Sequence, residues 1–262
     1  MIKQVLTIAG SDSGGGAGVQ ADLKAMSANG TFAMSVITSI TAQNTRGVTA
    51  IHNVPDTIIE AQIDAIIDDF DVEAVKTGML STATTTALIG RKMKQYGIKK
   101  LIVDPVMVSK SGHELLQPNA IKWLIQDLIP LAFLLTPNIP EAERLTGMTI
   151  RTLKEAREAA KALYKLGCQH VLIKGGHLTE NPATDLLYDG RYFRMYKGKF
   201  IDTKTTHGTG CTYASAITAQ LALGKPIADA IEVAKTYTTS AILHGLSIGH
   251  GHGPTNHFFF LS

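Results

Sequence analysis

One turn in the last quarter of the chain combines residue types that bind an anion. Residues 205–212 read TTHGTGCT and lead into a helix expected over 212–223. Gly208 and Gly210 let the backbone point N–H groups at one place, and the helix N-terminus adds partial positive charge there. With Thr209 they form a candidate site for a phosphoryl group in transfer, whose negative charge such donors stabilise.

Cys211 ends this turn and lies in or beside the first turn of the expected helix. A helix N-terminus lowers the pKa of a thiol toward neutrality, which suits Cys211 to accept a proton from an attacking hydroxyl group. It is therefore the candidate catalytic base. Cysteine is also a small residue that is often buried without a function, and the spacing alone does not separate the two interpretations.

A second glycine-rich segment, residues 9–24, reads AGSDSGGGAGVQADLK and joins an expected strand to an expected helix. A dinucleotide-binding turn also has this form, but the next strand ends in Gln43 and Asn44, without the acidic residue that holds a ribose. No Gly-Lys-Ser/Thr follows, so the segment is not a Walker A loop. Its glycines suit a mobile loop that closes over a small substrate, and a flexible surface turn is the alternative.

Gln43 follows an apolar run in the segment 41–48, TAQNTRGV. Its side-chain amide donates and accepts hydrogen bonds together, which matches the ring nitrogen and exocyclic amine of an aminopyrimidine. The alternative is a capped turn, in which Asn and Thr are common.

Asn138 and Glu141 are three residues apart at an expected helix start. Oxygen ligands at this spacing can hold Mg²⁺ through its waters, although capping of the helix by Asn138 is the interpretation that the sequence alone favours.

Lys174 follows a buried strand and is a candidate contact to the phosphates of ATP, or else an ordinary solvated lysine. Three histidines in the tail 249–257 suggest zinc, but no carboxylate or thiol accompanies them and the glycines indicate a loop.

The elements that position these residues alternate between strand and helix. Strands are expected over 5–9, 35–41, 74–77, 101–103, 132–135 and 170–174, and helices over 17–28, 57–70, 82–96, 119–129, 153–166, 212–223 and 227–243. This alternation predicts a mostly parallel sheet with helices on both faces, and Asp189-Gly190 predicts a hairpin within 184–201. Because ligands bind at the carboxyl ends of such strands, most of the unusual residue clusters meet at one edge.

The composition favours one α/β domain over residues 1–262. The chain has 45% apolar residues and a net charge of only +3, so no nucleic-acid partner is indicated. Its two cysteines are far apart, which suits a reducing compartment. The N-terminus does not resemble a signal peptide and no apolar run is long enough to cross a bilayer, so a cytoplasmic protein without a membrane partner is expected.

The motifs, in this order, resemble those of the hydroxymethylpyrimidine and phosphomethylpyrimidine kinases of thiamine biosynthesis, within the ribokinase-like superfamily. The resemblance extends from the glycine-rich loop to the Gly-His-Gly-Pro at 251–254. The turn 208–211 is similar to the anion-hole motif of the superfamily, in which sugar kinases carry aspartate at the last position. Cys211 therefore points to the pyrimidine kinases and some pyridoxal kinases.

The resemblance implies a three-layer fold and the phosphorylation, by MgATP, of 4-amino-5-hydroxymethyl-2-methylpyrimidine and then of its monophosphate. Transfer would be direct, without a phosphocysteine, and a homodimer is common among similar enzymes. The implied substrate contacts are Gly10, Asp22, Gln43, Met79 and Val106; the implied ATP contacts are Lys174, Thr206 and Asn138; and the implied magnesium environment is Asp104 and Glu141.

Three other functions remain open. Pyridoxal kinase is the nearest, because pyridoxal is also a heteroaromatic ring with a hydroxymethyl group, and Gln43 is the residue expected to discriminate. A nicotinamide-dependent oxidoreductase would need the missing ribose-binding acid. A noncatalytic module would bind a vitamin precursor without nucleotide turnover.

Overall fold

One nine-stranded sheet organises the computed structural model, which describes residues 1–109, 112–176 and 183–261. The strand order is β3-β2-β1-β4-β5-β6-β7-β8-β9, with the middle six parallel and antiparallel strands at both edges. The strands are β1 (Gln4–Asp12), β2 (Phe32–Asn44), β3 (Gly47–Asn53), β4 (Val72–Thr77), β5 (Leu101–Val103), β6 (Leu134–Leu135), β7 (Val171–Ile173), β8 (Thr184–Tyr188) and β9 (Phe193–Lys197).

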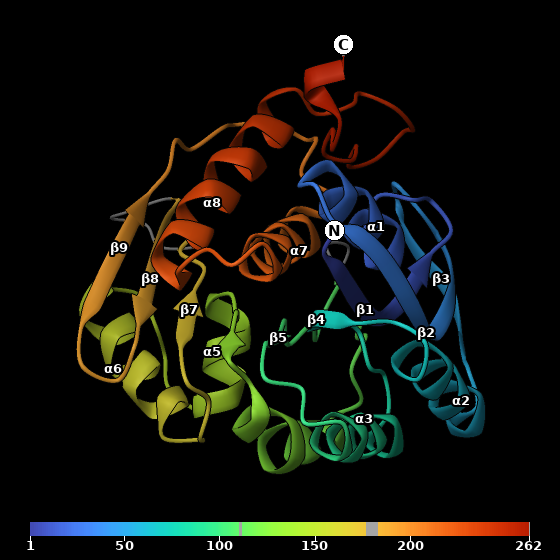
Figure 1. Cartoon of the computed structure of the whole chain (residues 1–262). Helices are drawn as coiled ribbons and strands as arrows, with labels where there is room; N and C mark the ends of the chain where they lie inside the picture. Colours follow the sequence, from blue (N-terminus) through green and yellow to red (C-terminus); the bar gives the residue numbers. More distant parts are fainter. Residues whose placement is uncertain (110–111, 177–182, 262) are drawn as a thin grey trace.

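Helices cover both faces of this sheet (Figure 1). One face carries α1 (Gly18–Ala28), α7 (Thr209–Ala222) and α8 (Ile227–Leu243). The other carries α2 (Asp56–Ile67), α3 (Ala83–Gln95), α4 (Ala120–Trp123), α5 (Ile139–Thr146) and α6 (Leu153–Tyr164), with the short segments η1 (Leu124–Leu128) and η2 (Ile129–Leu131). The predicted three-layer α/β architecture is thus confirmed.

Alternation along each strand divides the core between the two faces. Val5 packs under α1, α7 and α8, whereas its neighbour Leu6 packs on the opposite side. Leu134 and Leu135 divide in the same way. Because successive strand side chains point to opposite faces, strands buried on both sides are mostly apolar, and Thr7 in β1 and Lys76 in β4 are buried polar exceptions.

Two elements differ from the expectation. Strand β3 was not predicted: it forms an antiparallel hairpin with β2, so Gln43 and Asn44 are the last residues of a strand rather than the loop after it. The exposed side chains of β3 lack the alternating apolar pattern that marks a strand. The helix expected over 119–129 is a four-residue α-helix followed by η1 and η2. The expected hairpin within 184–201 is present as β8 and β9.

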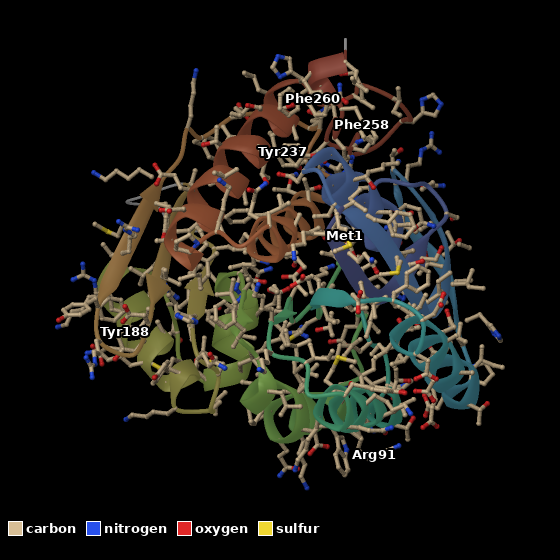
Figure 2. The ribbon with its side chains drawn as sticks, viewed as in Figure 1. Met1, Arg91, Tyr188, Tyr237, Phe258 and Phe260 are labelled. Atoms are coloured by element: carbon tan, nitrogen blue, oxygen red, sulfur yellow. The ribbon has the colours of Figure 1, made fainter. Side chains whose placement is uncertain are left out.

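The C-terminal segment, which ends in η3 (Phe259–Leu261), packs back over the ends of α7 and α8. The Asn256 N–H donates to the Ala241 carbonyl at 2.9 Å, and the Tyr237 hydroxyl donates to the His257 carbonyl at 2.9 Å. Figure 2 shows Tyr237 at the same end of the molecule as Phe258 and Phe260. None of the helices in the described ranges is long and apolar enough to traverse a bilayer.

Candidate active site

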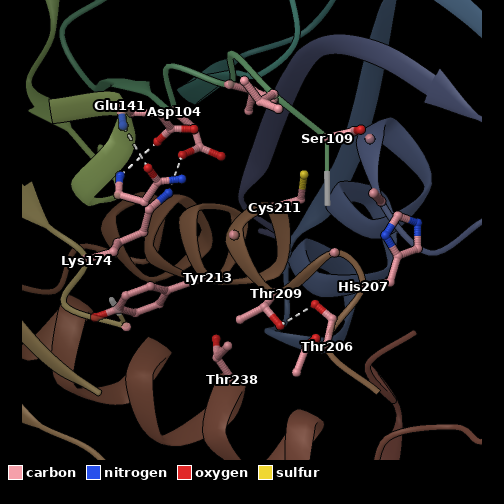
Figure 3. A pocket seen from close by; sticks show the side chains of 18 of the residues that line it. Asp104, Ser109, Glu141, Lys174, Thr206, His207, Thr209, Cys211, Tyr213 and Thr238 are labelled. Atoms are coloured by element: carbon pink, nitrogen blue, oxygen red, sulfur yellow. Dashed lines mark hydrogen bonds and ion pairs between the residues drawn. The ribbon is translucent and has the colours of Figure 1, made fainter. Parts of the chain in front are cut away.

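A cavity of about 690 Å³ opens at the carboxyl ends of the parallel strands (Figure 3). This edge is where an open α/β sheet binds its ligands. The glycine-rich loop, the ends of β2, β4 and β5, the start of α5 and the first turn of α7 all contribute to its wall. Every predicted site residue except Asp22 lines this cavity.

The turn before α7 has the conformation that an anion site requires. Gly208 is the N-cap residue with φ of 81°, and α7 begins at Thr209, three residues earlier than expected. A side chain at 208 would also collide with the Gly16 carbonyl, because a Cβ there would lie 1.8 Å from its oxygen. The first N–H groups of a helix have no partner within it. In α7 the Thr209 N–H donates to the Thr206 carbonyl at 3.3 Å, which leaves the N–H groups of the next residues as the candidate anion donors at this edge of the cavity.

Cys211 lies within that first turn and is half-buried, with its thiol toward the cavity. Burial raises the pKa of the thiol to about 11, and this outweighs the lowering by the Lys76 ammonium and the Gly18 N–H. The expectation that the helix end brings this pKa toward neutrality is therefore wrong. Removal of a charged group from water is the larger effect here.

Two acidic side chains and a lysine meet on the opposite wall of the cavity (Figure 3). The Lys174 ammonium donates to Asp104 Oδ1 at 2.6 Å, and the Thr136 hydroxyl donates to the same oxygen at 3.0 Å. Burial would raise the pKa of Asp104, but Lys174 and Lys76 hold it below its ordinary value. Lys174 is thus a partly buried, paired cation and not an ordinary solvated lysine.

Glu141 is held beside this pair by a capping box at the start of α5. The Asn138 side chain accepts from the Glu141 N–H, and Glu141 Oε2 accepts from the Asn138 N–H, both at 2.8 Å. Burial, with repulsion from Asp104, raises the pKa of the Glu141 carboxyl to about 7. Asn138 therefore does cap the helix, and by doing so it fixes a carboxylate on the cavity wall.

The predicted substrate end combines one amide with apolar side chains. Gln43 Oε1 accepts from the Thr41 hydroxyl at 3.0 Å, and Gln43 lines the cavity together with Met79 and Val106. Gly10 makes room for Met79, because a Cβ at position 10 would lie 2.9 Å from the Met79 sulfur. The arrangement offers a flat ring one polar edge and apolar contacts.

Asp22 does not reach the cavity, so its predicted contact with the substrate is corrected. Its side chain is fully buried between α1 and the sheet, where it accepts from the Lys76 ammonium at 2.8 Å and 2.9 Å. The hydroxyls of Thr7 and Ser215 donate to it at 2.6 Å and 2.7 Å. On α1 it occupies the face that packs on the sheet and α7, which the motif resemblance did not reveal.

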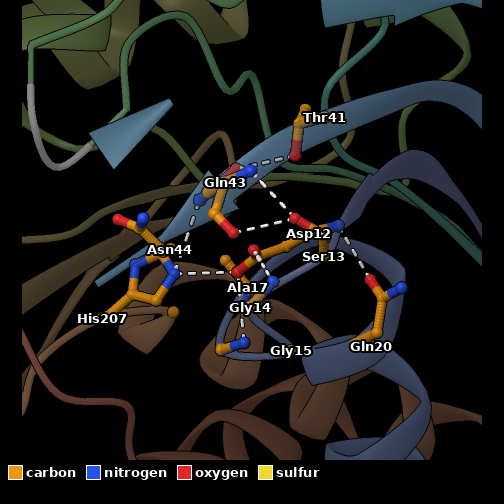
Figure 4. A network of polar contacts seen from close by, with 12 residues as sticks. Asp12, Ser13, Gly14, Gly15, Ala17, Gln20, Thr41, Gln43, Asn44 and His207 are labelled. Carbon is orange, nitrogen blue, oxygen red and sulfur yellow. Dashed lines mark hydrogen bonds and ion pairs between the residues drawn. The ribbon is translucent and has the colours of Figure 1, made fainter. Parts of the chain in front are cut away.

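Sequence reasoning missed the contact between the glycine-rich loop and the anion-binding turn (Figure 4). The buried Asp12 carboxylate accepts from the N–H groups of Gly14, Gly16 and Ala17 at 2.8 Å, 3.1 Å and 2.8 Å. It also lies 2.8 Å from His207 Nε2. An aspartate two residues before a glycine run was the available signal, since such a side chain commonly binds the N–H groups that follow.

Sequence reasoning also missed a further part of the cavity wall. This part is formed by Ala183, Phe200, Ile201, Thr238 and Ile242. These residues come from three separate segments without a shared motif, so no local pattern could have grouped them. In the tail, His250 and His252 are exposed, and the structure brings together no group of three metal-ligating side chains within the residues it describes.

Comparison with known proteins identifies the family. The chain is 51% identical over 260 residues to the hydroxymethylpyrimidine/phosphomethylpyrimidine kinase of Bacillus subtilis, covering 99% of this chain and 96% of that one. It is 50% identical over 261 residues to the enzyme of the same name from Rhizobium meliloti, covering 98% of each.

Crystal structures show the same ribokinase-like fold. Phosphomethylpyrimidine kinase from Clostridium difficile superposes with a TM-score of 0.83 at 48% identity, covering 92% of this chain and all of that one. An ADP complex of Bacillus subtilis pyridoxal kinase superposes with a TM-score of 0.92 at 39% identity, covering 100% and 99%. The phosphomethylpyrimidine kinase family model matches residues 12–256. With nearly the whole chain matched, the protein belongs to the phosphomethylpyrimidine kinase family.

Proposed function

We propose that this chain uses ATP to phosphorylate 4-amino-5-hydroxymethyl-2-methylpyrimidine, and then the resulting monophosphate to the diphosphate, as one kinase domain over residues 1–262. In the first reaction the thiolate form of Cys211 accepts the hydroxymethyl proton and becomes the thiol, while the oxygen forms a bond to the γ-phosphorus. The bond from that phosphorus to the ADP oxygen breaks. The N–H groups of Gly208 and Gly210 receive the charge that develops on the phosphoryl oxygens, together with that of Thr209 when it exchanges its 3.3 Å bond to the Thr206 carbonyl for the phosphoryl group.

The observation that carries this proposal is that groups suited to both substrates line one cavity. Gln43, Met79 and Val106 line it as the expected contacts of the aminopyrimidine, with Gly10 beside Met79. Cys211, the first turn of α7, Lys174 and Thr206 line the same cavity, and so do the apolar side chains of Phe200, Ile201 and Ile242, against which adenine would lie. A hydroxymethyl group would then meet the γ-phosphoryl group beside the thiol.

Asp104 and Glu141 fit a magnesium ion. Both carboxyl groups line the cavity, and their mutual repulsion contributes to the raised pKa of Glu141, which a divalent cation would relieve. With two protein carboxylates, Mg²⁺ would keep waters and bind phosphate oxygens, as it does in most kinases. When bound, the ion neutralises charge on the phosphates of ATP.

The test is ADP release with each candidate substrate in MgATP. The pyrimidine and its monophosphate are expected to support turnover well above that with pyridoxal. Gln43→Ala is expected to raise KM for the pyrimidine more than KM for ATP, by about 10-fold, because an unpaired amide edge is costly. A preference for pyridoxal would overturn the substrate assignment, and nucleotide binding without turnover would overturn the kinase.

Pyridoxal phosphorylation is the second candidate, and the fold comparison favours it specifically. A pyridoxal kinase from Staphylococcus aureus in complex with AMP-PCP and pyridoxal superposes with a TM-score of 0.91 at 34% identity. The greater identity to the pyrimidine kinases places pyridoxal second. The proposal further includes a homodimer in the cytoplasm, which light scattering of the purified protein and cell fractionation would test.

A further inference from the structure

A buried ion pair lies directly behind the wall of the cavity. The side chains of Lys76 and Asp22 are both 0% exposed, and the Lys76 ammonium is 2.8 Å from Asp22 Oδ2. Desolvation of two charges is expensive, so such a pair is weak evidence for stability. Its presence in the interior therefore calls for a function beyond holding the fold together.

The pair is built into the same wall as Cys211. Lys76 and Cys211 both line the cavity, and Ser215, one helical turn after Cys211 on α7, donates to Asp22 Oδ1 at 2.7 Å. Gly78 leaves space for the lysine, because a Cβ at position 78 would lie 2.9 Å from the Lys76 Nζ. The ammonium is therefore held in place by α1, α7 and the end of β4 together.

We propose that Lys76 is a positioning residue for catalysis: its ammonium, fixed by Asp22, supplies the positive charge that stabilises the Cys211 thiolate. The proposal rests on the role of Cys211 as the base in the proposed function. Asp22 contributes indirectly, since it keeps the buried lysine charged and oriented. A neutral residue at position 76 would leave the thiol with less compensation for its burial.

The other charges around the thiol do not replace this one. Asp22 and Asp104 are negative and raise the pKa of Cys211, whereas Lys76 lowers it and has a larger effect than either carboxylate. Lys174 is also near and, like Lys76, is paired with a carboxylate, that of Asp104 at 2.6 Å, but Lys76 is the lysine that most lowers the pKa of Cys211. His207 is paired with Asp12 at 2.8 Å. Lys76 is thus the main positive charge acting on the sulfur from the described residues.

The test is a direct titration of the thiol in the full chain without substrate. The chain has only two cysteines, so ¹³Cβ-cysteine NMR gives two signals, and Cys211→Ser assigns them. Lys76→Met is expected to move the Cys211 midpoint upward by about 1 pH unit or more, since removal of a nearby opposite charge disfavours the thiolate. A general loss of packing would not produce a selective shift of this one signal.

Two further variants keep the test decisive. Asp22→Asn with Lys76→Met removes both charges and leaves none unpaired, so it remains testable if the single variant fails to fold; its midpoint is expected about 0.5 unit above wild type. Lys92→Met removes another buried lysine, paired with Asp64 on the opposite face of the sheet, and is expected to leave the midpoint unchanged.

An unchanged Cys211 midpoint in the folded double variant would overturn the inference. The outcome is separable from the proposed function, because the titration contains no nucleotide. If ADP release is absent while the midpoint shifts as expected, the kinase proposal fails. The effect of the Lys76 charge on the Cys211 thiol is then still supported.

Discussion

Cys211 occupies the third position of α7, where the helix end and the surrounding protein act on its thiol in opposite directions. The helix end favours the thiolate, but burial disfavours it and raises the pKa to about 11. A base of this kind accepts a proton only as the thiolate, which the raised pKa makes a minor species near neutral pH. The residue therefore depends on the charges around it.

The first prediction concerns the thiol itself. Cys211→Ala is expected to lower turnover by about 10² to 10⁴, because a general base is lost, and Cys211→Asp is expected to restore part of the rate. ADP release at saturating substrate measures both. Cys168→Ala is the matched control: that cysteine is buried away from the cavity and should cost stability without loss of turnover. Full activity in Cys211→Ala would show that Cys211 is not the catalytic base.

At the level of the element, two helices begin with the same device but only one serves the cavity. Both α5 and α6 start with a complete capping box, formed by Asn138 with Glu141 and by Thr152 with Glu155. In α5 the acidic partner lies on the cavity wall, and in α6 it lies on the molecular surface. Comparison of the two helices therefore distinguishes the effect of capping on stability from the effect of Glu141 on catalysis.

Removal of either cap is expected to lower the free energy of unfolding by about 1 kcal/mol. Asn138→Ala should also lower turnover with MgATP, since Glu141 loses its alignment, whereas Thr152→Ala should leave turnover at the wild-type level. Urea denaturation and ADP release measure the two effects. Equal turnover in the two variants would show that the first cap is only structural.

Two left-handed glycines on α7 provide a similar comparison. Gly208 and Gly224, at the two ends of the helix, have φ of 81° and 87°, so alanine is strained at both. Only at 208 does the added carbon collide, with the Gly16 carbonyl, and beside Gly224 the space is open. Gly208→Ala is expected to reduce turnover by at least about 100-fold through displacement of oxyanion donors, and Gly224→Ala to cost stability alone. A normal rate in folded Gly208→Ala would contradict the oxyanion role.

Across the whole molecule, the C-terminal segment connects loops that are distant in sequence. The Thr45 carbonyl accepts from the His252 N–H at 2.8 Å, and the His207 N–H donates to the Gly253 carbonyl at 3.0 Å. The same segment buries His257 against α7, where its Nε2 lies 2.9 Å from the Thr212 hydroxyl. The hairpin that bears Gln43 and the anion-binding turn are thus fixed relative to each other.

Burial of His257 predicts a pH-dependent stability. Burial lowers its pKa to about 4, with a contribution from Lys24, so the unfolded chain binds the proton between about pH 6.5 and 4 while the folded chain does not. The free energy of unfolding should therefore fall as pH falls through this window, by up to about 3 kcal/mol. His257→Asn should flatten that dependence in urea denaturation, and His250→Asn, at an exposed position, should not. If His257→Asn leaves the pH dependence of the unfolding free energy unchanged, His257 is not the group responsible for it.

Alternation of apolar strands and helices sufficed to predict the three layers, because strands buried on both faces are largely apolar. The glycines of the turn before α7 likewise predicted a tight turn into a helix, which the structure has on the cavity wall, and anion binding there stays a prediction. Strand β3 was not predicted from the sequence, since an exposed edge strand needs no apolar face. The contact of Asp12 with His207 was not predicted either, because it joins residues 195 positions apart.

The sequence by itself determined the local conformations of the strands, helices and turns. It also determined the edge of the sheet at which the candidate site residues meet. What only the tertiary structure decided was the burial of each charged group: Asp22 faces inward to Lys76, Lys174 faces Asp104, and Cys211 is far less acidic than its helix position implies. The physical reason is that a pKa and an ion pair depend on distance and desolvation through space, and neither quantity is encoded by neighbouring residues.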